Sequence, residues 1–279
     1  MRRVGPGRRV FFMVSAVRVA VAALALAMGA TAGSAWAQAQ PFKPVIAQPE
    51  LSMNIGGGVV YGFSPTGGKS ERLNFTPWGD FNWRDRIYGN PLDGLGYNVV
   101  KSDRVRAGVQ IRPHYSGQST IEGLELPDLG ADLALYGFVR APGNISIGGR
   151  VMRDIRGQTD GTDYYVSVAN QSVTPVGLLV STVYLRGGDA KSNNAYLGVD
   201  EHEAAVTGLE TYMPGAGLQN VGVALMMMTP IGDKWAVGSF VNAERALGDV
   251  ADSPLIQARK REEMAYRGGV LVVRRLAFD

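Results

Sequence analysis

The stretch GLQNVGVALMMMTPIGDKWAVGSFVNAE (Gly217–Glu244) alternates apolar residues with small or polar ones. In its first half one parity holds Val221, Val223, Leu225 and Met227. The segment PIGDK near the middle has the residues of a tight turn, and the alternation resumes after it. A side-chain period of two is typical of β-strands that are apolar on one face only. The stretch therefore predicts two antiparallel strands of a sheet whose two faces meet different surroundings.

The clearest alternation in the chain lies in a second stretch, Arg104–Ser116. Its apolar parity includes Val105, Val109 and Ile111, whereas arginine recurs on the other parity. In a soluble β-sandwich the charged face would be exposed to water. In a membrane barrel the charged face would line the lumen, and the valine face would contact lipid.

The lengths of the connections separate these two architectures. Short turns are expected at Arg84, Lys101, Pro142, Thr174 and Ile231, and longer polar connections at Ser64, Pro91, Gly117, Gln158, Gly188 and Gly248. The two kinds alternate, as in outer-membrane barrels with short periplasmic turns and longer external loops. We therefore predict an all-β fold, a closed antiparallel transmembrane β-barrel of about twelve strands over residues 51–279 with both termini periplasmic. The longest connection, Gly188–Ala216, is expected to be a loop.

Residues 1–37 have the features of a signal peptide. Four arginines precede an apolar run from Val19 to Ala30, and Ala35-Trp36-Ala37 is a small-x-small cleavage site. An uncleaved anchor is the alternative, but Arg18 leaves the run short of the ~20 residues that a spanning helix needs. Met13 is an alternative start. We expect cleavage near Ala37, a periplasmic lead-in over residues 38–50, and location in the outer membrane of a Gram-negative cell.

Charge and composition exclude several classes of function. The whole chain carries +3, and the leader holds five arginines and no acid, so the remainder carries −2. This balance gives no support to nucleic-acid binding. The chain has no cysteine, which excludes a lipoprotein anchor, disulfides and thiol chemistry. An exported chain of this kind, with outer-membrane lipid as its surroundings, is expected to need no cofactor.

Residues for catalysis are scarce. The two histidines are His114 and His202, and the run Asp200-Glu201-His202-Glu203 has the composition of a metal or acid–base cluster. Four consecutive residues do not converge on one point unless a helix folds them, so we interpret the run as a solvated loop. We therefore expect a protein that is not an enzyme and has no metal site, with a rim hydrolase as a distant alternative.

A row of charged residues shares the inward parity of the predicted strands, and it is the most informative polar feature. Its members are Arg104, Arg106, Arg112, His114, Asp132, Arg140, Arg150, Asp154, Glu244 and Arg267. Two interpretations stay open: a packed interior held by salt bridges, or an anion-favouring pore. Because about twelve strands lie between filled small barrels and the 16-stranded porins, we favour a filled or narrow lumen.

Four segments carry a family resemblance, in an order and spacing that cover nearly the whole chain after the leader. They are GLGYN (Gly94–Asn98), NNAYLGV (Asn193–Val199), TGLETYMPGAGL (Thr207–Leu218) and GDVADSPL (Gly248–Leu255). Together they resemble the MltA-interacting protein (MipA/OmpV) family of Gram-negative outer membranes. The resemblance implies a non-enzymatic barrel that acts as a scaffold in peptidoglycan remodelling. Its implied partners are a lytic transglycosylase and a bifunctional murein synthase on the periplasmic side.

The OmpV branch of the same family implies other roles, adhesion and stress-responsive permeability, in which the external loops would carry the function. A narrow porin is a further alternative. Nothing in the sequence separates these branches, and the motifs identify no partner-contacting residue.

Overall fold

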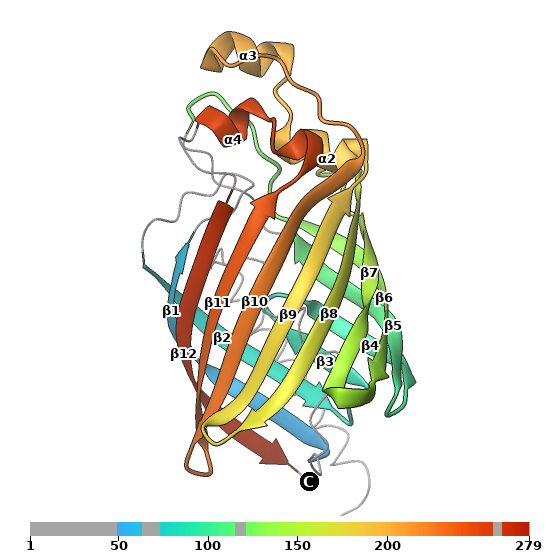
Figure 1. Ribbon diagram of the computed structural model, residues 1–279, viewed down its shortest axis with the longest axis vertical. Helices are drawn as coiled ribbons and strands as arrows, with labels where there is room; N and C mark the ends of the chain where they lie inside the picture. Colours follow the sequence, from blue (N-terminus) through green and yellow to red (C-terminus); the bar gives the residue numbers. More distant parts are fainter. Residues whose placement is uncertain (1–48, 63–72, 115–120, 259–263, 279) are drawn as a thin grey trace, which may run out of the picture.

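The computed structural model describes residues 49–62, 73–114, 121–258 and 264–278, so the expected signal peptide and most of the expected lead-in lie outside the described residues. Twelve strands form one closed barrel in which each strand pairs antiparallel with its neighbours in the sequence, and β1 pairs with β12 to close it (Figure 1). This confirms the predicted closed antiparallel barrel. Leu51 opens β1 opposite Phe278 of β12, so both ends of the barrel sequence lie at one end of the barrel.

The strand bounds agree with the predicted positions of the connections within a few residues. They are β1 Leu51–Gly62, β2 Asn74–Trp83, β3 Ile87–Asn90, β4 Gly94–Lys101, β5 Val105–His114, β6 Gly130–Ala141, β7 Ile145–Asp154, β8 Thr162–Thr174, β9 Gly177–Gly188, β10 Gly217–Ile231, β11 Trp235–Ala246 and β12 Met264–Phe278.

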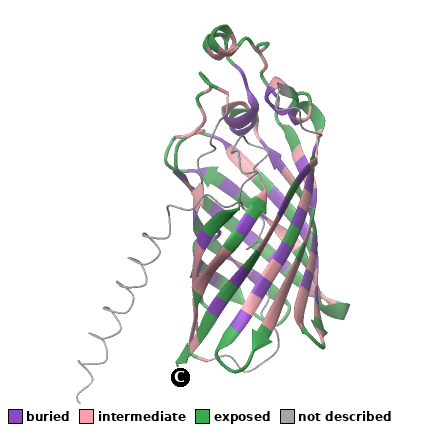
Figure 2. Ribbon diagram, turned by 90° about the vertical axis from the view of Figure 1, so that its left-hand side faces the viewer, coloured by how far each residue is buried: buried purple, intermediate pink, exposed green. Residues whose placement is uncertain are grey.

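Exposed and buried residues alternate along the strands (Figure 2). On β7, Ile147 is 50% exposed, whereas the preceding Ser146 is 4% exposed. On β8, Val168 is 48% exposed and Ser167 is 6% exposed. At these positions the apolar side chain is the exposed one and the polar side chain the buried one, the reverse of a water-soluble protein. A closed barrel with this pattern is suited to lipid outside and a polar interior.

Two inward tyrosines explain why glycine recurs on the inward parity. Tyr88 of β3 lies opposite Gly96 of β4, and Tyr184 of β9 lies opposite Gly222 of β10. A Cβ atom on Gly96 would lie 2.2 Å from the Tyr88 ring, and one on Gly222 would lie 2.3 Å from the Tyr184 ring. Each ring thus lies over the neighbouring strand, in the space that the side chain of any residue other than glycine would occupy.

Short turns join the strands at the barrel end that contains Leu51 and Phe278, which we call the inner rim. Between β2 and β3 the turn is Arg84-Asp85, and both residues have positive φ, 50° and 53°. The Arg86 amide donates to the Trp83 carbonyl at 2.9 Å, and two positive φ values between these residues are the geometry of the hairpin turn that matches strand twist. Because short turns face the periplasm in outer-membrane barrels, we expect the inner rim to be the periplasmic end.

The opposite, outer end carries longer connections and three helices, α2 (Ala190–Leu197), α3 (Glu201–Thr207) and α4 (Pro254–Ala258) (Figure 1). The connection Gly188–Ala216 is therefore not the helix-free loop that the sequence predicted. Asp189 accepts from the Ser192 amide and begins α2, and Asp200 forms a capping box with Glu203 that begins α3. The interpretation of Asp200–Glu203 as a loop was wrong, since three of these residues belong to a helix, but Asp200, Glu201 and His202 are exposed as expected.

Within the described residues, none of the helices combines the length and the apolar character that crossing a membrane requires.

The wall of the barrel is uneven in height. β3 has 4 residues, whereas β1 and β6 have 12 each. The pairing between β2 and β3 extends only from Trp83↔Ile87 to Phe81↔Gly89, because β3 ends at Asn90. In the Pro91–Asp93 turn that follows, Leu92 is 5% exposed and Asp93 is 4% exposed, so both are buried.

Candidate functional site

A buried ion cluster in the barrel interior is centred on Asp93. Arg150 of β7 donates from Nη1 to Asp93 Oδ1 at 2.7 Å, and Arg112 of β5 has its Nε 3.7 Å from the same oxygen. Arg112 also donates to the Leu92 carbonyl at 3.3 Å. The three charged side chains are 4–6% exposed. Two guanidinium groups thus hold the β3–β4 turn inside the barrel.

A second buried cluster lies on β9, β11 and β12. Arg267 donates to Glu244, which is 2% exposed. Tyr184 donates to the second Glu244 oxygen at 3.1 Å, and Asn242 donates to the Tyr184 hydroxyl at 2.8 Å. Breaking a buried pair by removing one partner leaves an uncompensated charge, so this cluster ties three strands together.

Near the outer mouth, His114 is held between a carboxylate and a helix. Its Nδ1 lies 3.0 Å from Asp132 Oδ1, and its Nε2 contacts the hydroxyl of Tyr196 from α2. Burial raises the pKa of the Tyr196 phenol, and the nearby carboxylates of Asp163 and Asp132 raise it further. Tyr196 therefore stays neutral, and its hydrogen bond with His114 joins α2 to the barrel interior.

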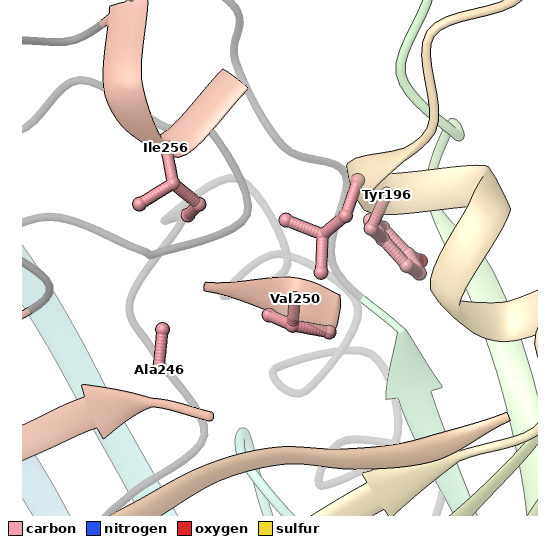
Figure 3. Packing of buried hydrophobic residues seen from close by; sticks show 5 residues of the cluster. Tyr196, Ala246, Val250 and Ile256 are labelled. Carbon is pink, nitrogen blue, oxygen red and sulfur yellow. The ribbon is translucent and has the colours of Figure 1, made fainter. Parts of the chain in front are cut away.

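The helical segments above this mouth pack into a small core of their own, which we call the outer cap. It joins α2 to the short helix η4 (Gly248–Val250) and to α4, through buried Tyr196, Leu197, Ala246, Val250 and Ile256 (Figure 3). Ser253 donates to the Leu197 carbonyl at 2.7 Å, and Tyr212 donates to the Asp249 carbonyl at 2.8 Å. Three of the four segments that carry the family resemblance meet in this cap.

The members of the predicted charged row at the inner end differ in how far they are buried. Arg106 pairs with Asp85 of the β2–β3 turn, and both side chains are largely buried. Arg140 is half-buried near the inner end of β6. Arg104 lies in the turn before β5 and is exposed, because β5 begins one residue later than predicted.

The remaining members of the predicted charged row are in the interior. The buried ones are Arg106, Arg112, Asp132, Arg150, Asp154, Glu244 and Arg267, and His114 is partly buried. Sequence reasoning missed Asp85 and Asp93, which supply the carboxylates for Arg106, Arg112 and Arg150. Both lie in turns, so strand parity gave no signal for them.

Asp154 has a different kind of partner from the other buried acids. Its carboxylate accepts from the amides of Arg156, Thr159 and Asp160, at 2.8, 2.6 and 3.1 Å. The Asp154 carboxylate therefore fixes the backbone of the β7–β8 connection at the outer rim. Its cross-strand neighbour Asp132 is instead paired with His114.

Exposed charges differ in sign between the two ends of the barrel. The inner rim has seven exposed basic residues, Arg84, Arg86, Lys101, Arg104, Lys234, Arg274 and Arg275, against the exposed acids Glu50, Asp103 and Asp233. The described outer end instead has nine exposed acids, Glu122, Glu125, Asp128, Asp160, Asp200, Glu201, Glu210, Asp249 and Asp252, against the exposed basic residues Arg153, Arg156, Lys191 and Arg245. The inner rim is therefore a basic surface.

One cavity of about 310 Å³ occupies the inner half of the lumen. It reaches from Asp85 in the inner turn to the Asp93–Arg150 pair. Strands β2 to β6 supply a polar and aromatic wall, and Met226, Met228, Leu271 and Val273 supply an apolar wall on the other side.

The described residues contain no group of three or more His, Asp or Glu side chains placed to hold a metal ion.

The family model "MltA-interacting protein MipA" matches residues 55–275, which include almost the entire barrel. The chain belongs to the MltA-interacting protein family. It is accordingly an outer-membrane barrel protein, in keeping with the apolar exterior of its wall. None of the curated proteins compared with the chain matches it.

Solved structures that are similar to this MltA-interacting family member are distant. A bacterial polysaccharide outer membrane secretin is 11% identical with a TM-score of 0.41, covering 84% of this chain and 100% of that one. The outer membrane channel DcaP of Acinetobacter baumannii is 12% identical with a TM-score of 0.36, covering 81% of this chain and 96% of that one.

Proposed function

We propose that this barrel is a non-enzymatic scaffold that holds murein-degrading and murein-synthesising enzymes at the periplasmic face of the outer membrane. The family name gives the class of partner, since it describes proteins that interact with MltA. The observation that carries the proposal is the basic inner rim, because partners in the periplasm reach the barrel at that end.

The chemistry of the rim fits an acidic protein surface. Exposed arginine and lysine side chains lie around the mouth, and Lys101 is fixed there by donating to the Arg84 carbonyl at 2.7 Å. Charges of this kind steer a partner of opposite sign and set its orientation more than they add affinity. Exposed rim charges are also screened by salt, so docking here has a strong dependence on ionic strength.

Buried ion pairs inside the barrel support a scaffold rather than a channel. The Asp93 cluster lies within the lumen beside the cavity of about 310 Å³, and Tyr196 of the outer cap contacts His114. Opening a path past these groups would require breaking buried ion pairs, each at a cost of about 3–5 kcal/mol if one partner loses the other. The rims are then the surfaces on which the protein acts.

A binding measurement tests the proposal. The barrel in lipid nanodiscs is titrated with a purified lytic transglycosylase and with a purified bifunctional murein synthase. We expect both to bind, and we expect the triple variant Arg84→Gln/Lys101→Gln/Lys234→Gln to bind at least tenfold more weakly at low salt. The matched control Glu201→Gln/Glu210→Gln/Asp252→Asn, at the outer end, should bind like the parent.

Equal binding by the parent and the inner-rim variant would overturn the basic rim as the docking surface, and absence of binding would overturn the scaffold. The same nanodisc protein is also fused with planar bilayers. Steps of anion-selective current would show a narrow porin instead.

A further inference from the structure

A pair of cations lies on the outside of the barrel wall near the inner rim, where β1, β12 and β11 run side by side (Figure 1). Arg274 of β12 lies directly opposite Ile55 of β1 on one side and Trp235 of β11 on the other. Lys234 ends the β10–β11 turn and precedes Trp235. We propose that Arg274 and Lys234 bind the phosphate of an anionic phospholipid in the leaflet around the inner rim. This proposal goes beyond the scaffold function and does not depend on it.

Arg274 belongs to the lipid-facing row of its strand. Along β12 the side chains alternate, so that Val272 is 46% exposed and Val273 is 3% exposed. Arg274 continues the outward parity of Val272 and is exposed. Its cross-strand neighbours Ile55 and Trp235 are exposed apolar side chains of the same outer surface. An arginine in such a row places its stem on the apolar wall and its guanidinium among the lipid headgroups.

The two cations are not neutralised by the protein. In the part of the chain that the structure describes, neither Arg274 nor Lys234 forms an ion pair. Asp233, the acid next to Lys234, is exposed and likewise has no ion pair with a described residue. Glu50, just before β1, pairs with Arg84 instead. The positive charge on this part of the wall is therefore available to an anion from the membrane.

The backbone holds both cations at one place. The Arg275 amide donates to the Lys234 carbonyl at 2.6 Å, which joins the β10–β11 turn to β12 directly beside Arg274. A guanidinium can donate two parallel hydrogen bonds to a phosphate, and an ammonium adds a compact point charge. Arg275 is itself exposed at this edge and adds a third positive charge against the single acid Asp233.

The surroundings of the cations fit a lipid better than a soluble anion. Val272, Ile55 and Phe278 are exposed on the same face and provide an apolar surface for an acyl chain. Trp235 is of the residue type that anchors barrels at the membrane interface. Clustered basic side chains at the membrane surface attract anionic lipids. A zwitterionic headgroup offers the same phosphate together with an ammonium group, which lowers its attraction to these cations.

The test uses the full chain after its signal peptide, purified in mild detergent and titrated separately with phosphatidylglycerol and with phosphatidylethanolamine. Native mass spectrometry counts the bound lipid molecules. We expect phosphatidylglycerol to bind at least fivefold more tightly than phosphatidylethanolamine, and we expect Arg274→Gln/Lys234→Gln to lose this preference. Inorganic phosphate at the lipid concentration should not displace phosphatidylglycerol, because it lacks the acyl chains. Displacement would show a site for a soluble anion and would overturn the lipid as the ligand.

The matched control is Arg84→Gln/Lys101→Gln, which removes the same charge from the same rim at the β2–β3 turn and the end of β4. This control should keep the preference of the parent. The gel mobility of each variant before and after heating checks its folding. The proposal is overturned if the parent binds the two lipids equally, if Arg274→Gln/Lys234→Gln keeps the preference, or if the control loses it to the same extent.

A second readout needs only the parent protein, so it stands even if a variant does not fold. A photoreactive phosphatidylglycerol is cross-linked to the barrel, and the labelled peptides are identified by mass spectrometry. Label concentrated on β1, β11 and β12, and reduced by excess phosphatidylglycerol more than by excess phosphatidylethanolamine, supports the site. Label spread evenly around the wall, or reduced equally by the two lipids, contradicts it.

Discussion

Leu51 lies directly opposite Phe278, and from there the β1–β12 register continues without a shift to Gly62↔Arg267. The penultimate position of Phe278 therefore does not shorten the closing pair of strands. The same register places Arg274 opposite Ile55 and Trp235, on the outside of the wall near the inner rim. An arginine at that level extends its guanidinium to the lipid headgroups, which explains the break in the apolar parity of the last strand.

The parity of β5 is tested by two neighbouring substitutions. Val109→Arg places a cation on the lipid-facing side at mid-strand and should impair membrane assembly by about 2–4 kcal/mol. Gln110→Arg should assemble, because that side chain borders the 310 Å³ cavity, where a longer group has room. Yields of the heat-modifiable barrel band in membranes are compared. Equal yields from the two variants would mean that the inward and outward assignments are wrong.

The close contact between Tyr184 and β10 predicts a large effect of a single methyl group. Gly222→Ala forces a Cβ atom to within 2.3 Å of the Tyr184 ring, so the ring or the strand must shift. Overpacking of this kind costs about 1–3 kcal/mol. Gly137→Ala is the matched control, since nothing lies within 4 Å of its added Cβ. The urea midpoint of unfolding in detergent should fall for Gly222→Ala and not for Gly137→Ala.

Removing one partner of the Glu244–Arg267 pair should destabilise the barrel, because the charge of the other partner stays buried. Glu244→Ala leaves the Arg267 charge buried without its carboxylate and should cost about 3–5 kcal/mol. The double change Glu244→Leu/Arg267→Leu should recover most of this loss, because no buried charge remains. Conversion temperatures of the folded gel band are measured, with Glu201→Ala at the exposed outer helix as the control. A double variant no more stable than Glu244→Ala would contradict a penalty of charge burial.

Acid should weaken the start of α2. Partial burial would raise the pKa of the Asp189 carboxyl, but hydrogen bonds from the Ser192 and Thr162 amides outweigh it and lower the pKa. A carboxyl with a lowered folded-state pKa stabilises the fold above its unfolded pKa of about 3.9. That contribution is lost as the pH falls through the lower, folded value.

Hydrogen exchange of the α2 amides, corrected for intrinsic rates, measures this loss. Protection should fall below pH ~4 in the parent. Asp189→Asn keeps a good helix cap and carries no titratable group, so its protection should stay nearly constant over the same range. A steep fall in the variant as well would assign the acid effect to another group.

Insertion of a short epitope tests which end faces outward. A tag after Gly208, at the end of α3, should bind antibody on intact cells, because the outer connections face outward. A tag at Gly143, in the β6–β7 turn, should bind antibody only after the outer membrane is permeabilised. The reverse pattern would mean that the barrel is inserted the other way.

Strand alternation and connection lengths were sufficient to predict the barrel, because each strand contacts its sequence neighbours and the lipid-facing parity repeats every second residue. They also predicted the burial of residues such as Arg112, Arg150 and Glu244. The partners of these residues could not be predicted from the alternation. Asp93 lies in the turn after β3, and this turn is inside the lumen because β3 is only 4 residues long. Side-chain alternation does not predict where a strand ends.

The helices of the outer cap were missed for a related reason. α2 has little amphipathic character along its 8 residues, because its buried face holds Ser192 and Asn193 as well as Tyr196 and Leu197. The available signals were the caps: Asp189 precedes Ser192 by three residues, and Asp200 precedes Glu203 by three, which is the spacing of helix starts. Arg104 was placed in the interior because the predicted strand started one residue too early.

The short β3 also has a consequence for the surrounding membrane. At ~3.3 Å per residue its four residues extend about 13 Å, roughly half of the ~25 Å apolar band of an outer-membrane barrel. Lipid beside β3 therefore meets a wall lower than that beside β6 or β10. A bilayer adapts to such mismatch by thinning locally. The protein should thus be surrounded by an asymmetric annulus of lipid, thinnest next to β3, and this side would attract neighbours that prefer a thin membrane.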